Sequence, residues 1–252
     1  MLNLGEYIKG SLSIWDCHVH LFDDNGVIPY KKPYDNMIIM TENALNDRSL
    51  MPYFDELFKK NLPKNIYPLC VGKDKEETKE IYNKYKDKFF GIGEIKAYKH
   101  YKNIKNVEKE HFDKSILEDS IQYCLPIFLH WDLNGKHDDE LYNIIKSNKD
   151  TTFILCHCGM NKLDNQVDSF NRAIEFQTTL PNLWLDISWV TLDYLTKNTN
   201  ELSKIEIPDH ILVGTDYSSL VNSVDFDDIY NNFKKIYQQF NIPSNIKNLI
   251  SK

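Results

Sequence analysis

The 252-residue chain has the length of one α/β barrel or of two ordinary domains, so length alone does not decide between them. Its net charge of −7, from 30 Lys and Arg against 37 Asp and Glu, disfavours a protein that binds nucleic acid by neutralising phosphates, although it leaves a small anionic substrate open. Five cysteines without dense, even spacing argue against a secreted disulfide framework and favour a reducing cytoplasm.

The N-terminal residues 1–12 lack the basic segment and apolar run that are typical of a signal peptide. The apolar stretches elsewhere are strand-sized, well short of the roughly 20 residues that a membrane-spanning helix needs. We therefore expect a cytoplasmic monomer or homodimer that binds neither membrane nor nucleic acid and acts on a small-molecule substrate.

Eight short apolar runs rich in β-branched and aromatic residues recur along the chain, most of them separated by a candidate helix. The predicted strands are 12–20, 36–40, 66–71, 89–97, 125–131, 152–158, 183–189 and 211–217. The predicted helices are 50–60, 75–85, 112–123, 138–146, 164–178 and 225–240, followed by the start of a last helix at 244–252. Two further segments, 98–110 and 192–205, are predicted as irregular loop or extra helix.

Apolar strands that alternate with helices indicate a parallel sheet covered by helices. Eight such units predict an α/β fold of the (β/α)8 type, a slightly distorted TIM barrel. No linker rich in Pro, Gly or Ser divides the sequence, so residues 1–252 are expected to form a single domain.

The first predicted strand ends in two histidines separated by one residue. Because side chains alternate along a strand, Asp16, His18 and His20 share one face. Two imidazoles at this spacing can reach the same metal ion, each through a neutral nitrogen. Such a pair taken alone is more often structural or exposed. Whether it binds a metal therefore depends on which residues end the other strands.

Polar residues also end the fifth, sixth and eighth predicted strands, namely His130, His157 and Asp216. The C-terminal ends of barrel strands surround one mouth, where barrel active sites lie. Four histidines and a carboxylate at this mouth form a ligand set suited to zinc, manganese, iron or nickel. The sequence therefore predicts a divalent-metal site. The remaining histidines lie in predicted loops or before strands and are expected at the surface: His100, His111, His137 and His210.

Six motifs spread over nearly the whole chain carry a family resemblance. They are WDCHVH at 15–20, GIGEIK at 91–96, LPIFLHW at 125–131, FILCHCG at 153–159, LWLDIS at 183–188 and ILVGTDY at 211–217. In them the chain resembles the amidohydrolase superfamily, and more closely the amidohydrolase-related branch (amidohydrolase 2) of metal-dependent hydrolases and decarboxylases. The resemblance implies one or two divalent ions, with zinc expected first and manganese, iron or nickel as alternatives.

The resemblance also implies a role for each residue at the strand ends. His18 and His20 would be metal ligands, and Asp216 would be a ligand that also transfers a proton. In a single-metal site, His130 completes the ligand set and His157 acts on the substrate as an acid, base or electrophile. In a two-metal site, both of these histidines hold the second ion.

Glu94 decides between the two arrangements. The segment GIGEI at 91–95 also resembles that of the TatD-type deoxyribonucleases whose glutamate bridges two metals, so Glu94 is expected to bridge two ions or to hydrogen-bond to a ligand of one. Lys96 shares its face and has three interpretations: a solvated charge, a carboxylated bridge, or a residue that binds an anionic group of the substrate.

Four residues are candidates to contact the substrate: Lys96, Trp131, Ser188 and Trp189. Cys156 and Cys158 flank His157, but strand alternation would turn both away from its face, and we expect buried thiols that bind no metal. The connection 21–35 after the first strand resembles a flexible loop over the mouth, and a lid is one interpretation of it.

The leading hypothesis is a metal-dependent hydrolase. A metal held by imidazoles and a carboxylate lowers the pKa of bound water to roughly 7; Asp216 would take the proton, and His157 would polarise the carbonyl. The alternatives are a nonoxidative decarboxylase of a carboxylated ring compound, a TatD-like phosphodiesterase, which the acidic balance disfavours, and a catalytically silent binding barrel. No nucleotide cofactor is implied, since no phosphate-binding loop or dinucleotide fingerprint occurs.

Overall fold

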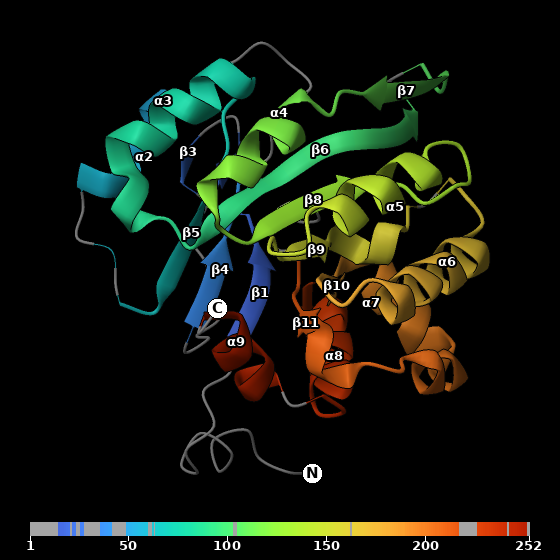
Figure 1. Cartoon of the computed structure of the whole chain (residues 1–252). Helices are drawn as coiled ribbons and strands as arrows, with labels where there is room; N and C mark the ends of the chain where they lie inside the picture. The colour runs from blue at the N-terminus through green and yellow to red at the C-terminus, as the bar shows by residue number, and fades with distance from the viewer. Residues whose placement is uncertain are drawn as a thin grey trace.

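The computed structural model of the chain describes residues 15–20, 22–23, 26–27, 36–41, 49–59, 62, 64–102, 105–161, 163–216, 226–240 and 242–250. Eight parallel strands form a nearly closed barrel with helices between them, which confirms the predicted (β/α)8 fold (Figure 1). In spatial order the strands are β1 (Trp15–Val19), β4 (Asn36–Ile39), β5 (Ile66–Cys70), β6 (Gly91–Lys102), β8 (Ile127–Trp131), β9 (Phe153–Leu155), β10 (Leu183–Ile187) and β11 (Ile211–Val213).

The barrel closes where the end of β11 approaches β1. The backbone N–H of Asp216 donates to the His18 carbonyl at 2.8 Å. A Cβ atom on Gly214 would lie 2.4 Å from the His18 Cβ, so glycine is required for this close approach. Asp16 fixes the same junction, because its side chain accepts hydrogen bonds from the backbone N–H and the hydroxyl of Thr215 at 2.9 and 2.7 Å. This junction sets Asp216 beside the histidines of β1.

The helices lie outside the barrel (Figure 1). They are α2 (Met51–Lys59), α3 (Lys75–Tyr85), α4 (Ser115–Ser120), α5 (Asp138–Ser147), α6 (Gln166–Thr179), α7 (Trp189–Lys197), α8 (Phe226–Tyr237) and α9 (Ile242–Ile250). Short 3-10 segments are η1 (Lys86–Lys88), η2 (Ile121–Tyr123), η3 (Cys156–Gly159), η4 (Thr199–Lys204) and η5 (Pro208–His210). Each predicted helix has a counterpart in the structure, and their apolar faces bury residues such as Phe54 of α2 and Ile145 of α5 against the strands.

The prediction of loop or helix for residues 98–110 is wrong. Strand β6 continues to Lys102 and pairs in antiparallel fashion with β7 (Glu108–Phe112). Cross-strand pairs explain this hairpin: the Tyr98 and Phe112 rings lie 6.0 Å apart, and the Lys102 amine lies 3.7 Å from the Glu108 carboxylate. The segment 192–205, by contrast, is helical, so the second of the two alternatives predicted for it, extra helix, is confirmed.

Two of the histidines predicted at the surface differ from that expectation. His100 lies in β6 and His111 in β7, so neither occupies a loop. The ring Nδ1 of His100 lies 3.0 Å from an Asp164 carboxylate oxygen, and the residue is only partly exposed. These histidines are therefore parts of the hairpin that extends β6 beyond the barrel.

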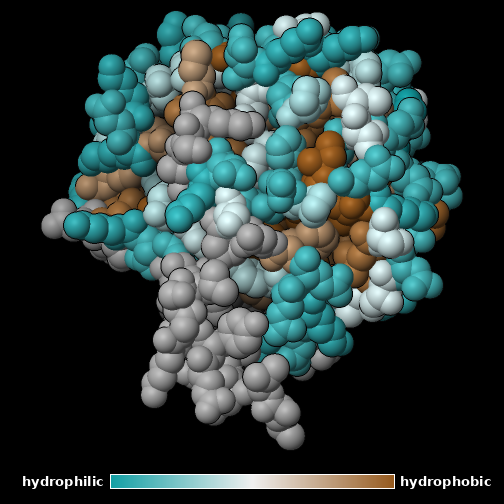
Figure 2. All heavy atoms as spheres, turned by 60° about the horizontal axis from the view of Figure 1, so that its bottom comes forward, coloured by the Kyte–Doolittle hydropathy of each residue, from teal (hydrophilic) through white to brown (hydrophobic). Residues whose placement is uncertain are grey.

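Most of the predicted lid lies outside the described residues. Within segment 21–35, the structure describes only the antiparallel strands β2 (Phe22–Asp23) and β3 (Gly26–Val27). In the part of the chain that is described, no helix has the length and apolar character needed to cross a membrane. Figure 2 brings the lower side of Figure 1 forward and shows mostly hydrophilic residues at the periphery, with hydrophobic residues gathered toward the middle.

Candidate metal centre

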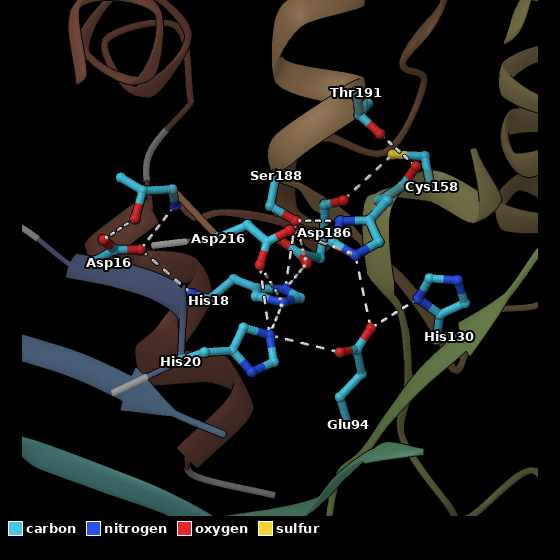
Figure 3. A network of polar contacts seen from close by, with 12 residues as sticks. Asp16, His18, His20, Glu94, His130, Cys158, Asp186, Ser188, Thr191 and Asp216 are labelled. Atoms are coloured by element: carbon cyan, nitrogen blue, oxygen red, sulfur yellow. Dashed lines mark hydrogen bonds and ion pairs between the residues drawn. The ribbon is translucent and has the colours of Figure 1, made fainter. Parts of the chain in front are cut away.

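Six side chains from the strand ends converge in one buried cluster, and Figure 3 shows most of them pointing toward one another. They are His18, His20, Glu94, His130, His157 and Asp216. None is more than 6% exposed. All six predicted ligand candidates thus lie at the same end of the barrel, although they come from five different strand ends.

One part of the cluster consists of His18, His20 and Asp216, which we call the first half-site. The Nε2 atoms of His18 and His20 face each other at 3.1 Å. Asp216 Oδ1 lies 3.6 Å from the former and 3.4 Å from the latter. Three potential ligand atoms therefore surround a single point next to the β1–β11 junction.

The other part consists of His130, His157 and Glu94, which we call the second half-site. Glu94 Oε1 lies 2.9 Å from His130 Nδ1 and 3.6 Å from His157 Nε2. The other oxygen of this carboxylate, Oε2, lies 3.5 Å from His20 Nε2. Glu94 therefore stands between the half-sites and presents one oxygen to each.

The ring nitrogens that point away from the cluster are held by other polar side chains. Asp186 Oδ2 lies 2.6 Å from His18 Nδ1, and Asp132 Oδ1 lies 3.1 Å from His130 Nε2. The Ser188 hydroxyl lies 2.9 Å from His157 Nδ1 and donates to Asp186 at 2.7 Å. Contacts of this kind fix the orientation and tautomer of metal-binding histidines.

Sequence reasoning did not assign these supporting roles to Asp132 and Asp186. The signal for Asp186 was present, since it shares a strand face with Ser188 at the end of the seventh predicted strand. Asp132 follows directly after the fifth strand, where only its register could have shown which ring it meets. The backbone N–H of His100 donates to its second oxygen at 2.5 Å, so β6 fixes this carboxylate as well.

Electrostatics favours a charged Glu94 carboxylate in the cluster. Burial alone would raise the pKa of Glu94, but hydrogen bonds from His130 and His157 hold it well below its usual value. Burial opposes protonation of His18, yet the carboxylates of Asp186 and Asp216 raise the pKa of His18 well above its usual value. Burial lowers the pKa of His20 to about 4. At neutral pH Glu94 is therefore ionised and His20 uncharged, the states in which each can bind a metal, whereas an ion would have to displace a proton from His18.

Several strand ends have left-handed backbone, which side chains other than glycine rarely adopt. His157, Trp189 and Asp216 have φ values of 54°, 44° and 55°. Such conformations are concentrated at functional sites, where the surrounding structure maintains them. The turn through His157 and Cys158 also corrects the sequence argument about the cysteines: β9 ends at Leu155, so strand alternation does not orient them.

The residues present fit a divalent cation. Asp216 Oδ1 is buried and, within the described ranges, accepts no hydrogen bond, although a buried carboxylate oxygen normally needs a partner. Three sets of side chains in the described part of the chain could each hold an ion: His18 with His157 and Asp186, His18 with His20 and Glu94, and Glu94 with His130 and His157. Nitrogen and oxygen donors of this kind suit zinc and neighbouring transition metals.

The predicted substrate-binding residues lie in different places. Lys96 is buried and pairs in register with His130. The Trp189 ring lies 5.6 Å from the His157 ring, and Ser188 contacts the same histidine. The Trp131 ring is fully buried and packs edge-on against the aromatic rings of Tyr98 and Phe112, which does not favour the predicted contact with substrate.

Thr41 is a further polar residue near the cluster that sequence reasoning did not single out. Its carbonyl accepts a hydrogen bond from the Glu94 backbone N–H at 2.7 Å, and its buried hydroxyl has no hydrogen-bond partner among the residues described. A polar residue directly after the second predicted strand was the available signal. Like the polar residues that end the other strands, Thr41 is therefore a candidate residue of the site.

Comparisons with known proteins agree with this architecture. Residues 122–234 match the model of a family described as amidohydrolase. No curated protein matches the sequence. A probable 2-pyrone-4,6-dicarboxylic acid hydrolase from Acinetobacter baumannii, with citric acid bound, has a similar structure: 11% identity, TM-score 0.59, and coverage of 96% of this chain and 100% of that one.

Two other similar structures are an amidohydrolase and a dihydroorotase. The amidohydrolase, from Burkholderia multivorans with bound zinc, has 10% identity and a TM-score of 0.57 over 90% of this chain and 92% of its own. The dihydroorotase has 12% identity and a TM-score of 0.56 over 94% of this chain and 69% of its own. At such identities the structural likeness concerns the fold, whereas the family match concerns the sequence of residues 122–234.

Proposed function

We propose that the chain is an enzyme of the amidohydrolase superfamily and a metal-dependent hydrolase of a small polar substrate, which the family match of residues 122–234 and the shared barrel fold support. One observation carries this proposal: Asp216 Oδ1, buried and without a hydrogen-bond donor in the described residues, faces the ring nitrogens of His18 and His20. A cation satisfies this oxygen and both nitrogens together.

We assign the ligands by half-site. His18, His20 and Asp216 would hold one ion, and Glu94, which faces both half-sites, would bridge to a second ion held by His130 and His157. Zinc is the first candidate, supported by the nitrogen and oxygen donors and by the zinc in the similar amidohydrolase. A bound divalent cation would supply Lewis acidity, which lowers the pKa of water toward roughly 7 and polarises the scissile carbonyl.

The chain's own residues would perform the proton transfers. Asp216 accepts a proton from the attacking water and returns it to the leaving group, as a general base and then a general acid. In the alternative arrangement with a single ion, His157 would keep Nε2 free, 3.9 Å from Asp216 Oδ2, and would stabilise the developing oxyanion of the substrate. Ser188, at His157 Nδ1, keeps the ring in this orientation.

Hydrolysis is tested with zinc-loaded protein and a panel of small cyclic amides, lactones and esters, by measuring the carboxylic acid released. We expect turnover that a chelator abolishes and that zinc restores. His18→Ala should lose this activity, whereas His137→Ala should retain it because His137 stacks on Phe112 outside the cluster. Turnover that survives both the chelator and His18→Ala would contradict a metal-dependent reaction.

Nonoxidative decarboxylation is a second candidate, favoured by the buried Lys96 beside the cluster. A cation there could hold the carboxylate of a ring compound while the bond to that group breaks. The same assay with carboxylated aromatic acids, read as carbon dioxide released, separates the two reactions. Release of carbon dioxide without any hydrolysis product would replace the leading proposal.

A further inference from the structure

Ser188 begins helix α7 but does not use its side chain to cap it. A serine at this position normally accepts a hydrogen bond from a backbone N–H of the first helical turn, which stabilises a helix by about 1 kcal/mol. No such bond forms here, although the Ser188 backbone has the extended conformation typical of a helix N-cap. The hydroxyl is buried and contacts Asp186 and His157 (Figure 3). It therefore serves the metal-ligand cluster rather than the helix.

The single hydrogen of this hydroxyl already has an acceptor. A carboxylate can only accept, so Ser188 donates to Asp186 Oδ2 at 2.7 Å. Toward His157 Nδ1, at 2.9 Å, the serine oxygen can then only accept. His157 Nδ1 therefore carries a hydrogen, whatever the state of the Nε2 atom on the other side of the ring.

The Nε2 atom of His157 faces carboxylates. It lies 3.6 Å from Glu94 Oε1 and 3.9 Å from Asp216 Oδ2. A neutral imidazole has one N–H hydrogen, and without an acceptor at Nδ1 these carboxylates would hold that hydrogen on Nε2. A nitrogen that carries a hydrogen has no lone pair for a metal ion. The acceptor at Nδ1 therefore determines whether His157 can be a ligand.

The first turn of α7 also holds the backbone of His157. The hydroxyl of Thr191, a buried residue of this turn, donates to the His157 carbonyl. This contact lies at the left-handed turn in which His157 has a φ of 54°. Ser188 and Thr191 together hold the ring and the backbone of the same histidine, so α7 fixes which nitrogen faces the cluster.

We propose that Ser188 is a positioning residue that keeps a hydrogen on His157 Nδ1 and so presents the Nε2 lone pair to the second ion. The inference rests on the proposed function in its two-ion arrangement, and it gives Ser188 this role in place of the predicted contact with substrate. Asp186 Oδ2, which accepts from Ser188, also lies 2.6 Å from His18 Nδ1. The same pair of side chains thus supports one histidine of each half-site.

The test compares wild-type and variant protein loaded with zinc. Ser188→Ala removes the acceptor at Nδ1, whereas Ser188→Thr keeps a hydroxyl at the same position. Ser169→Ala is the matched control, because this buried hydroxyl on α6 donates to the Leu133 carbonyl rather than to the cluster. Competition with a chelator measures the affinity of each ion. Two-dimensional proton–nitrogen NMR spectra show which ring nitrogen carries a hydrogen, and His157→Gln identifies the signals of His157.

We expect wild-type protein to bind two ions, with a hydrogen on Nδ1 of His157 and zinc at Nε2. Ser188→Ala should weaken the second ion about 10–100-fold, the range for residues that orient a metal ligand, and should leave the hydrogen of a neutral His157 on Nε2. The first ion should be affected less, since His18 keeps its own contact with Asp186. Ser188→Thr should retain more of the second ion than Ser188→Ala, and Ser169→Ala should match the wild type.

A hydrogen on Nε2 of His157 in zinc-loaded wild-type protein would overturn the inference, and this result does not depend on the folding of any variant. Ser188→Ala protein that binds both ions like the wild type, or that loses both equally, would also overturn it. Wild-type protein that binds no zinc contradicts the proposed function itself. Wild-type protein that binds one ion and hydrolyses its substrate overturns only the role of Ser188.

Discussion

The two half-sites satisfy their polar groups in different ways. In the second half-site, His130 and Glu94 make a direct contact of 2.9 Å, so each partner of this pair is satisfied without an ion. In the first half-site, two ring nitrogens face each other at 3.1 Å and Asp216 Oδ1 accepts no hydrogen bond in the described part of the chain. The first half-site is therefore the one that needs a cation, and we expect it to bind an ion more tightly than the second.

Loss of a ligand should have the largest effect and should differ between the half-sites. His20→Ala should abolish tight metal binding and activity, a larger effect than the roughly 10–100-fold expected for a supporting residue. His157→Ala should leave one ion bound, because its half-site does not include the tight position. Metal analysis after dialysis measures both, and equal metal loss in the two variants would contradict the difference between the half-sites.

Neutralising the carboxylate between the half-sites should have the next largest effect. Glu94→Gln keeps the size of the side chain but removes the charge that faces His20 and His130. We expect the number of bound ions to fall from two to one, with the remaining ion at the first half-site. Titration with zinc gives this number. An unchanged content of one ion in wild type and variant would support the single-metal arrangement instead.

The supporting carboxylates should have smaller effects that again divide by half-site. Asp186→Asn should weaken binding of the tight ion roughly 10–100-fold, because Asp186 orients the His18 ring at 2.6 Å. Asp132→Asn should leave this ion in place and affect only the second half-site, since its ring partner is His130. Competition with a chelator of known affinity measures both variants. Weakening of the tight ion by Asp132→Asn would show that the half-sites are coupled.

The smallest expected effect concerns the pH dependence of stability. Burial, and then Lys99, lowers the pKa of Lys96 well below its usual 10.5. Between the lowered pKa and 10.5, the unfolded chain binds a proton that the folded chain does not, so stability rises with pH in this window. In metal-free protein, Lys96→Met should therefore raise the melting temperature by a few degrees at low pH, and the gain should shrink as pH approaches 10.5. Thermal denaturation at several pH values tests this, and a gain independent of pH would contradict it.

The sequence predicted the barrel well because each strand combines a buried apolar run with a polar strand end. His18, His20 and Asp216 could be placed together from this pattern alone, since the carboxyl ends of barrel strands share one mouth. Closure between β11 and β1 then adds what the pattern lacks, because the absence of a side chain at Gly214 allows the approach that brings Asp216 to His18.

Other features required three-dimensional contacts. The side chain that meets each outer histidine nitrogen depends on register and rotamer, which left the roles of Asp132 and Asp186 unassigned. The left-handed turn at His157 breaks the alternation on which the cysteine argument relied. The β6–β7 hairpin was missed because β7 is short, mostly charged and exposed, and so lacks the apolar run that marked the other strands.

The most direct test of the metal centre is anomalous diffraction from crystals grown with zinc. We predict a strong zinc peak bounded by the Nε2 atoms of His18 and His20 and by Asp216 Oδ1, and a weaker peak between Glu94, His130 and His157. A first half-site without a zinc peak in protein that folds normally, with the two rings bonded only to each other and to Asp216, would contradict the account.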